Sequence, residues 1–174
     1  MHEAVGKAVD LKTRQIHVER MTVTSSKPLG DVVKILEASV GHPDMSVFPK
    51  EIAATQSEAE LERIVNRATG ASGLMIFMRL DLGEVLRKEQ GASARKSLRY
   101  LIGNPVTMKA MAKHVPDAGS YAPVTILVDE RPDGVHLSYD RMASYLAAYG
   151  NEEALKVARE LDSKVEALLK KAAA

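Results

Sequence analysis

The side chain in this sequence that is best suited to chemistry is the imidazole of His114. It follows Met111 by three residues in a segment with helical apolar spacing, so it shares one helix edge with Met108 and Met111. A neutral imidazole in such apolar surroundings can bind a haem iron, and beside Asp117 or Tyr121 it can act as a general base. The structural alternative is a protonated histidine that the carboxyl end of a helix stabilises.

The start of the same helix is a candidate anion site. Gly103, Asn104 and Pro105 are typical of a capped helix start, where free N–H groups and the positive end of the dipole suit a carboxylate or phosphate. The structural alternative is an ordinary helix cap, in which the Asn104 side chain serves only the backbone.

A basic segment precedes this helix. Residues 87–99 contain five basic residues against the single acid Glu89, a local net charge of +4. We expect Arg95, Lys96 or Arg99 to meet the acid groups of a ligand. A solvated charged loop is the alternative interpretation.

A further set of residues would support an enzyme. Tyr139 and Asp140 end a predicted hairpin and could act as acid and base, with Arg79 as a partner and His114 as the general base. Asp140 also has a plain role as the cap of the next helix. The sequence lacks the nucleophile elbow, the phosphate-binding loops and the zinc-protease motif, so the reaction class stays unknown.

The composition excludes several classes of protein. The chain has 174 residues, of which 24 are basic and 23 acidic, and a net charge of +1. Near-neutrality argues against a nucleic acid partner, since such proteins usually carry a clear basic excess. No apolar run reaches the length of a membrane span, and no cysteine is available for a disulfide or a thiolate metal site. We therefore expect a cytoplasmic protein that binds neither membrane nor nucleic acid.

Hydrophobic periodicity and cap residues predict a mixture of strands and helices. Strands are predicted at residues 14–25, 74–81, 97–102, 124–130 and 135–139. Helices are predicted at residues 28–41, 57–70, 82–89 and 141–149, and two more helices are predicted to begin at residues 105 and 151. Residues 42–56 are predicted to be irregular or briefly helical. The hairpin around the Pro-Asp-Gly turn at residues 132–134 is the clearest local signal.

The chain shows no linker or repeat, which indicates one domain over residues 13–174 behind an N-terminal arm at residues 1–12. In the terminal helix, apolar residues at 154, 158, 161, 165 and 168 are spaced by four and three. This spacing favours packing on the protein's own sheet, with a two-helix dimer seam as the alternative.

Several of these features occur together between residues 101 and 151. They are the Gly-Asn-Pro turn at 103–105, a methionine in the following helix, a proline before a strand and Ser-Tyr at the end of the hairpin. With them the chain resembles the bacterial and archaeal family called domain of unknown function 302, and the resemblance extends more weakly over residues 14–100. It implies an α+β fold in which helices cover a mainly antiparallel sheet of TATA-binding-protein-like topology, and it implies homodimers.

One segment departs from the family pattern. Many members carry a histidine after the central strand in a motif like I-D-H-A, whereas residues 79–82 here read Arg-Leu-Asp-Leu. A role for that histidine therefore does not carry over to this chain. The resemblance by itself implies no activity.

Together these observations predict a pocket near Asn104, His114 and Tyr121. The leading hypothesis is a small, partly apolar, anionic ligand. Haem is the candidate cofactor, and in that case His114 would be its axial ligand and the metal-binding residue. Met108 and Met111 would then line the apolar wall. The alternatives are an enzyme with His114 as general base on an unknown small substrate, and an interaction module that dimerises without a ligand.

Overall fold

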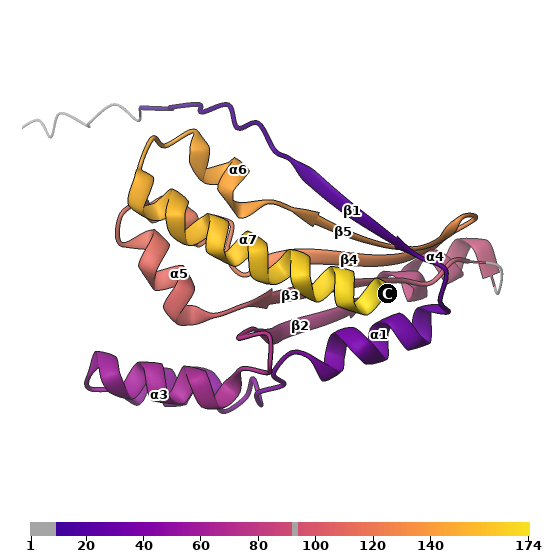
Figure 1. Cartoon of the computed structure of the whole chain (residues 1–174), viewed down its shortest axis with the longest axis horizontal. Coiled ribbons are helices and arrows are strands. Elements are labelled where there is room, and N and C mark those ends of the chain that lie inside the picture. Colours follow the sequence, from indigo (N-terminus) through magenta and orange to yellow (C-terminus); the bar gives the residue numbers. More distant parts are fainter. Residues whose placement is uncertain (1–9, 92–93) are drawn as a thin grey trace, which may run out of the picture.

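Five antiparallel strands form one sheet in the order β1-β5-β4-β3-β2 (Figure 1). The structure is a computed structural model that describes residues 10–91 and 94–174. The strands are β1 (Arg20–Ser25), β2 (Met75–Asp81), β3 (Ser97–Gly103), β4 (Val124–Arg131) and β5 (Gly134–Asp140). The prediction of an α+β fold on an antiparallel sheet is confirmed.

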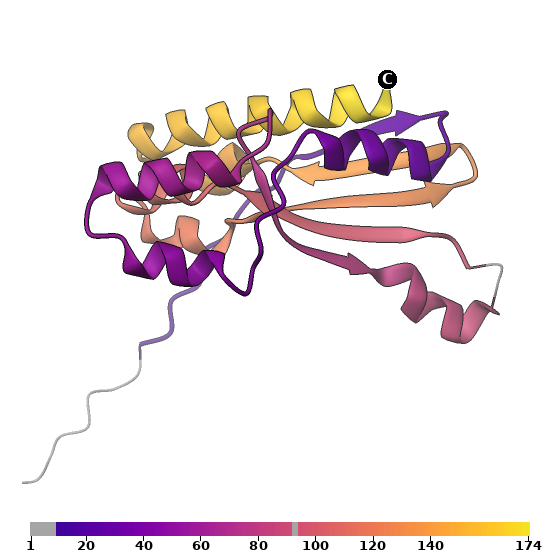
Figure 2. The same ribbon diagram turned by 90° about the horizontal axis from the view of Figure 1, so that it is seen from below.

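The helices cover one face of this sheet and one end of it. Figure 2 shows α1 and α7 along one face, α2, α3 and α5 gathered at one end, and α4 on the side away from α1 and α7. Their bounds are α1 (Leu29–Ala38), α2 (Phe48–Ala54), α3 (Glu58–Ala68), α4 (Leu82–Gln90), α5 (Pro105–Ala112), the 3-10 helix η2 (Pro116–Ser120), α6 (Met142–Ala147) and α7 (Glu152–Ala173).

Strand alternation decides which side chains meet the helices. In β4, Val124, Ile126 and Val128 are buried in the core that α1 and α7 share with the sheet. Successive strand residues point to opposite faces, so Thr125 and Leu127 lie on the other face. The sheet therefore has an apolar covered face and a second face of mixed character.

Helix α7 uses its apolar stripe to cover this sheet. Its buried residues include all those predicted to share one face, namely Ala154, Ala158, Leu161, Val165 and Leu168. These side chains belong to the main core cluster. The stripe thus packs on the protein's own sheet, as the sequence favoured, and is not free to form a two-helix seam.

The first strand is shorter than predicted. A strand from residue 14 is wrong for residues 14–19, because β1 begins at Arg20, opposite Asp140 at the end of β5. The preceding residues have no strand beside them to pair with. Arg14 instead donates from Nη1 to the carbonyl of Ala148 at 2.7 Å. Of the predicted N-terminal arm, residues 1–9 lie outside the described residues.

Local signals at element ends are confirmed. Ser57 caps α3 by accepting a hydrogen bond from the amide of Glu60 at 3.2 Å. Gly134 has a φ of +136°, and it closes the hairpin between β4 and β5. The segment predicted as irregular or briefly helical contains α2.

A close contact between two chain segments places the α2–α3 pair beside the sheet. Gly41, just after α1, pairs with Met75 and donates to the carbonyl of Leu74 at 2.8 Å. A Cβ atom on Gly41 would lie 1.8 Å from the carbonyl oxygen of Ala68 at the end of α3. Because that neighbour is backbone, only glycine permits this approach.

Candidate functional site

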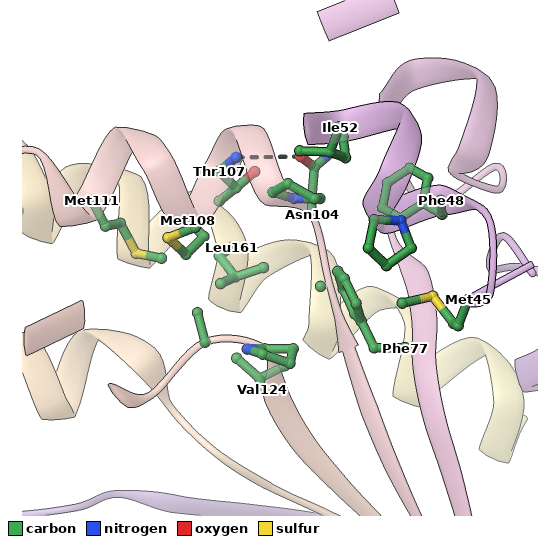
Figure 3. A pocket seen from close by; sticks show the side chains of 15 residues that line it. Met45, Phe48, Ile52, Phe77, Asn104, Thr107, Met108, Met111, Val124 and Leu161 are labelled. Carbon is green, nitrogen blue, oxygen red and sulfur yellow. Dashed lines mark hydrogen bonds between the residues drawn. The ribbon is translucent and has the colours of Figure 1, made fainter. Parts of the chain in front are cut away.

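A cavity of about 360 Å³ lies between α2 and α5, at the end of β3 (Figure 3). Helix α5 and the turn before it form one wall, and α2 with the loop before it forms the other. Side chains of β2, β4 and α7 complete the cavity. Its lining residues are Met45, Phe48, Pro49, Ile52, Phe77, Gly103, Asn104, Pro105, Thr107, Met108, Met111, Ala122, Pro123, Val124 and Leu161.

Asn104 sets the position of the α5 wall. Its Oδ1 accepts hydrogen bonds from the amides of Val106 at 2.9 Å and Thr107 at 3.3 Å, and its Nδ2 donates to the carbonyl of Gly73 at 3.0 Å. The amide group therefore caps α5 and ties it to the turn before β2. Asn104 lines the cavity, but its polar atoms are used by the backbone, which matches the helix-cap alternative.

The opposite wall depends on two aromatic rings. Phe48 is buried at the start of α2, and Phe77 lies at a register shift between Ile76 and Met78 in β2. This irregularity leaves Phe77 without a paired residue on β3, and its ring faces the cavity (Figure 3). The chain contains two phenylalanines, and both line this site.

An ion pair joins the two helical layers around the cavity. Lys109 on α5 contacts the carboxylate of Glu58 at the start of α3. The contact lowers the pKa of Glu58, first through the hydrogen bond from Lys109 and then through its charge. Both side chains are solvent-accessible, so the pair helps to orient α3 against α5 and adds little stability.

The cavity is almost purely apolar. Among the described residues that line it, none is charged, and the polar side chains are those of Asn104 and Thr107. Met108 and Met111 form part of the apolar wall. Since the Asn104 side chain is committed to capping, the Thr107 hydroxyl is the side-chain group here that can meet a ligand by hydrogen bonding.

His114 lies outside this cavity. Helix α5 ends at Ala112, and His114 follows in the turn, where its amide donates to the carbonyl of Met111 at 3.1 Å and its side chain is exposed. Of the three residues predicted to surround one pocket, Asn104 lines the cavity, whereas His114 and Tyr121 do not. The physical reason is that α5 ends at Ala112, two residues before His114, so the imidazole is not held on the helix edge beside Met111.

Tyr121 belongs to a separate aromatic cluster. Its ring stacks on Tyr145 with 4.5 Å between centroids, and its hydroxyl lies 2.8 Å from that of Tyr149. The guanidinium of Arg14 stands 4.5 Å above the Tyr149 ring. This cluster joins the segment before β1 to α6 and the loop that follows it.

The predicted cationic residues are far from the cavity. Arg99 lies on β3 and contacts the Thr125 hydroxyl at 3.4 Å, and Lys96 and Arg95 precede the strand. At about 3.3 Å per strand residue, Arg99 is roughly 13 Å from the Gly103 end of β3. These side chains therefore do not line the cavity, and the structure does not join them to Asn104.

The acid–base set predicted for an enzyme is not assembled. Tyr139 and Asp140 are consecutive in β5, so their side chains point to opposite faces of the sheet. Tyr139 is buried and donates to Asp162 at 2.6 Å, and this burial raises the pKa of Tyr139 well above its usual range. Asp140 pairs with Arg20 at 2.6 Å on the other face.

Arg79 forms a third, separate cluster with Tyr100 and Glu37. Its Nε donates to the Tyr100 hydroxyl at 3.1 Å, and that hydroxyl donates to Glu37 at 2.6 Å. Burial first, and the Glu37 carboxylate second, raise the pKa of Tyr100 above its usual range. The cluster connects β2 and β3 to α1, and it satisfies a hydroxyl at the edge of the core.

The Arg20–Asp140 pair predicts a weak acid sensitivity. The hydrogen bond from Arg20 holds the pKa of Asp140 below its usual range, so the pair stabilises the fold above the unfolded pKa. That contribution is lost as the pH falls through the folded pKa. We expect Arg20→Gln to lower the free energy of unfolding by about 0.5 kcal/mol near neutral pH and by almost nothing in strong acid. Urea unfolding of both proteins across this pH range measures it; an equal difference at both extremes would contradict the ion-pair explanation.

Sequence analysis missed the buried carboxylate of Asp162. It lies on the apolar face of α7 between Leu161 and Val165 and is 4% exposed. A charged residue among buried positions of an amphipathic helix is the signal that could have identified it. Sequence analysis also missed the α2 wall, because Phe48 and Ile52 meet α5 only through the tertiary fold.

The described residues hold no obvious metal centre or membrane span. Within residues 10–91 and 94–174, no three His, Asp or Glu side chains gather where they could hold a metal ion. In the same part of the chain, no helix is both long and apolar enough to cross a membrane.

Comparisons with known proteins agree with this architecture. No curated protein matches the chain significantly. The crystal structure of an uncharacterized conserved DUF302 protein from Bacillus stearothermophilus is similar, with a TM-score of 0.62 and 10% identity over 88% of this chain and 97% of that one. At that identity the likeness shows the fold alone. The model of the domain of unknown function DUF302 matches residues 50–172. The chain therefore belongs to the DUF302 family.

Proposed function

We propose that this protein binds a small, mainly apolar and uncharged ligand in the cavity between α2 and α5. The observation that carries the proposal is the cavity of about 360 Å³ whose lining side chains are apolar apart from Asn104 and Thr107. Ligand pockets in proteins are typically concave and apolar, with a few polar groups that fix orientation, and this volume lies within their usual range.

The lining also defines the chemistry of the ligand. An apolar ligand gains about 0.8 kcal/mol for each methylene group that it buries. A carboxylate or phosphate would lose its hydration here without meeting a cation, since Arg95, Lys96 and Arg99 lie elsewhere on the sheet. The geometry therefore favours a neutral ligand over the anionic one expected from sequence. A single hydroxyl or carbonyl group could meet the Thr107 hydroxyl.

Haem is a less favoured occupant. Its proposed axial ligand, His114, is exposed and outside the cavity, while the thioethers of Met108 and Met111 line it. The enzyme alternative is disfavoured for a related reason, since Tyr139, Asp140 and Arg79 occupy three separate clusters. Ligand binding without chemistry is the function that these contacts support best.

Dye displacement tests the proposal. The purified protein is titrated with a neutral naphthylamine dye whose fluorescence rises in apolar surroundings, and the dye is then displaced by straight-chain alcohols of increasing length. We expect saturable binding of one dye per chain and an affinity that rises about fourfold per methylene until the cavity is full. Carboxylates of equal length should compete less well.

The same titration distinguishes the alternatives. Absence of saturable dye binding, or stronger competition by carboxylates than by alcohols, would overturn the proposal. A hemin titration followed in the Soret region forms a separate arm. A Soret shift that His114→Ala abolishes would favour haem instead, whereas we expect this substitution to leave dye binding unchanged.

A further inference from the structure

Residues 42–69, which carry α2 and α3, are attached to the sheet at a single point. The chain leaves this point at Gly41 and returns to it at Gly70, and both amides donate to the carbonyl of Leu74, at 2.8 Å and 3.0 Å. Gly41 also accepts a hydrogen bond from the amide of Ile76 at 2.9 Å. Both ends of the segment are therefore fixed at the start of β2. We call residues 42–69 the α2–α3 segment.

The two ends of the α2–α3 segment cross with their backbones in contact. A Cβ atom on Gly70 would lie 2.4 Å from the carbonyl carbon of Val40, and one on Gly41 would lie still closer to a backbone atom. Glycine at both positions permits this approach. Hinges in proteins consist of a few residues in loops or at the ends of elements. The crossing of Gly41 and Gly70 has this form.

The α2–α3 segment has a small apolar core of its own. Phe48 on α2 and Ile64 and Val65 on α3 are buried together with Met75 of β2. Among the residues that the structure describes, the main core cluster includes none from this segment. A unit with few buried contacts to the rest of a fold opens at a lower free-energy cost than global unfolding. The segment can therefore move without disturbing the main core.

An ion pair joins the far end of the segment to the rest of the protein. Away from the crossing, within residues 10–91 and 94–174, the side-chain hydrogen bond that links the segment to another element runs from Lys109 on α5 to Glu58 at the start of α3. The positive charge of Lys113 also acts on Glu58. By contrast, the pair of Arg67 and Glu51, at 2.7 Å, lies inside the segment. Opposite charges thus hold the far end against α5.

The α2–α3 segment also supplies one wall of the ligand cavity. Met45, Phe48, Pro49 and Ile52 line the cavity from this segment, and the other lining residues belong to the rest of the protein. Figure 3 shows Phe48 across the cavity from Met108. A ligand in the cavity would contact both walls, so its contacts would favour the closed position of the segment.

We propose that the α2–α3 segment is a lid, which opens at the crossing of Gly41 and Gly70 to admit and release the ligand and which the Lys109–Glu58 ion pair holds closed. This inference deepens the proposed ligand binding and rests on it. A contact that only closes a lid slows association and dissociation by the same factor, so its loss leaves the dissociation constant nearly unchanged. A contact to the ligand itself acts mainly on the dissociation rate.

Stopped-flow mixing with the neutral dye measures exchange through the lid. We expect Glu58→Gln and Lys109→Gln each to raise both rate constants about two- to fivefold, the effect of losing one exposed ion pair. The double variant should be no faster than either single variant, because both changes remove the same contact. Arg67→Gln is the matched control, since it breaks an ion pair inside the segment and should leave both rate constants unchanged.

The sequence contains no cysteine, which permits a covalent test of the same movement. Glu58→Cys and Lys109→Cys are combined and joined by a short bismaleimide, which ties the lid to α5. We expect the cross-link to slow release of bound dye at least about tenfold, because the lid can no longer open. The same double variant capped with N-ethylmaleimide is the control, and it should release the dye at least as fast as wild type.

Thiol labelling follows the lid without any ligand. Met75 is 0% exposed and belongs to the apolar core of the α2–α3 segment, so a thiol reagent reaches the side chain of Met75→Cys only when the lid opens. We expect Glu58→Gln to speed this labelling about two- to fivefold. High salt should speed it in Met75→Cys alone, since salt screens the exposed ion pair. Circular dichroism verifies that each variant is folded.

The two readouts separate failure of the lid from failure of the proposed function. Saturable dye binding whose rates respond neither to the cross-link nor to Glu58→Gln would show that ligand enters without lid movement, and the inference would be wrong while the ligand site stands. Labelling of Met75→Cys that Glu58→Gln accelerates, in a protein that binds no dye, would support the lid movement and overturn the proposed ligand. Labelling that ignores both salt and Glu58→Gln would overturn the role of the ion pair.

Discussion

Replacing Asp162 with alanine is expected to destabilise the protein by about 3–5 kcal/mol. The carboxylate is buried in α7, where Oδ1 accepts hydrogen bonds from the Tyr139 hydroxyl at 2.6 Å and the amide of Met142 at 2.7 Å. Oδ2 accepts from the amide of Ala143 at 3.1 Å. These two amides begin α6, so Asp162 caps that helix from another element. Alanine would remove the acceptor of all three donors, of which the Met142 amide keeps a second acceptor in the Tyr139 hydroxyl at 3.1 Å. Each buried donor left unsatisfied costs about 1–3 kcal/mol.

Two variants separate this explanation from simple loss of packing. Tyr139→Phe removes one donor and keeps the carboxylate, and should cost only about 1 kcal/mol. Asp162→Asn keeps one acceptor oxygen, so its cost should lie between the two. Urea unfolding gives all three free energies. A loss below about 1 kcal/mol for Asp162→Ala would contradict a capping role for this carboxylate.

Filling the cavity should abolish ligand binding. Met108 is partly buried on α5 and its side chain faces the cavity (Figure 3). We expect Met108→Trp to weaken binding of the neutral dye at least about 30-fold, because the indole ring occupies space that the ligand requires and a loss of about 2 kcal/mol has that effect. The displacement titration described above measures this change.

Two controls make the cavity test specific. Met108→Leu conserves volume and should change the dye affinity by less than about threefold. His114→Ala alters the same chain segment outside the cavity and should have no effect. If Met108→Trp, still folded by circular dichroism, binds the dye as tightly as wild type, the dye site lies elsewhere and the cavity is not the binding site.

Local chemistry explains which parts of the fold were predictable from sequence. The hairpin between β4 and β5 depends on a turn whose Gly134 adopts a positive φ, and the starts of α3, α5 and α7 depend on Ser57, Asn104 and Asn151 as caps. Each signal acts within about four residues. The predicted strand at residues 14–25 was too long because strand length depends on a pairing partner that is distant in sequence. Residues 14–19 have strand-like alternation, but β5 ends at Asp140 and leaves them no partner.

The candidate site was predictable only in part, for the same reason. Met108 and Met111 follow from helical spacing within α5, and both line the cavity. The opposite wall comes from Phe48 and Phe77, which are distant in sequence and are brought together by the fold. His114 shows the reverse case, because α5 ends two residues before it and leaves a chemically attractive side chain in solvent.

Short sequence patterns specify the β4–β5 hairpin, the helix caps, the apolar faces and the uncharged segment 103–108, since these properties belong to short segments. The enclosure of a cavity by these segments, the capping of α6 by Asp162 and the separate environments of Tyr139 and Asp140 follow from the packed fold. Each of these depends on contacts between residues far apart in the chain. Such contacts arise from the packing of α2, α5 and α7 around the sheet, which no local pattern encodes.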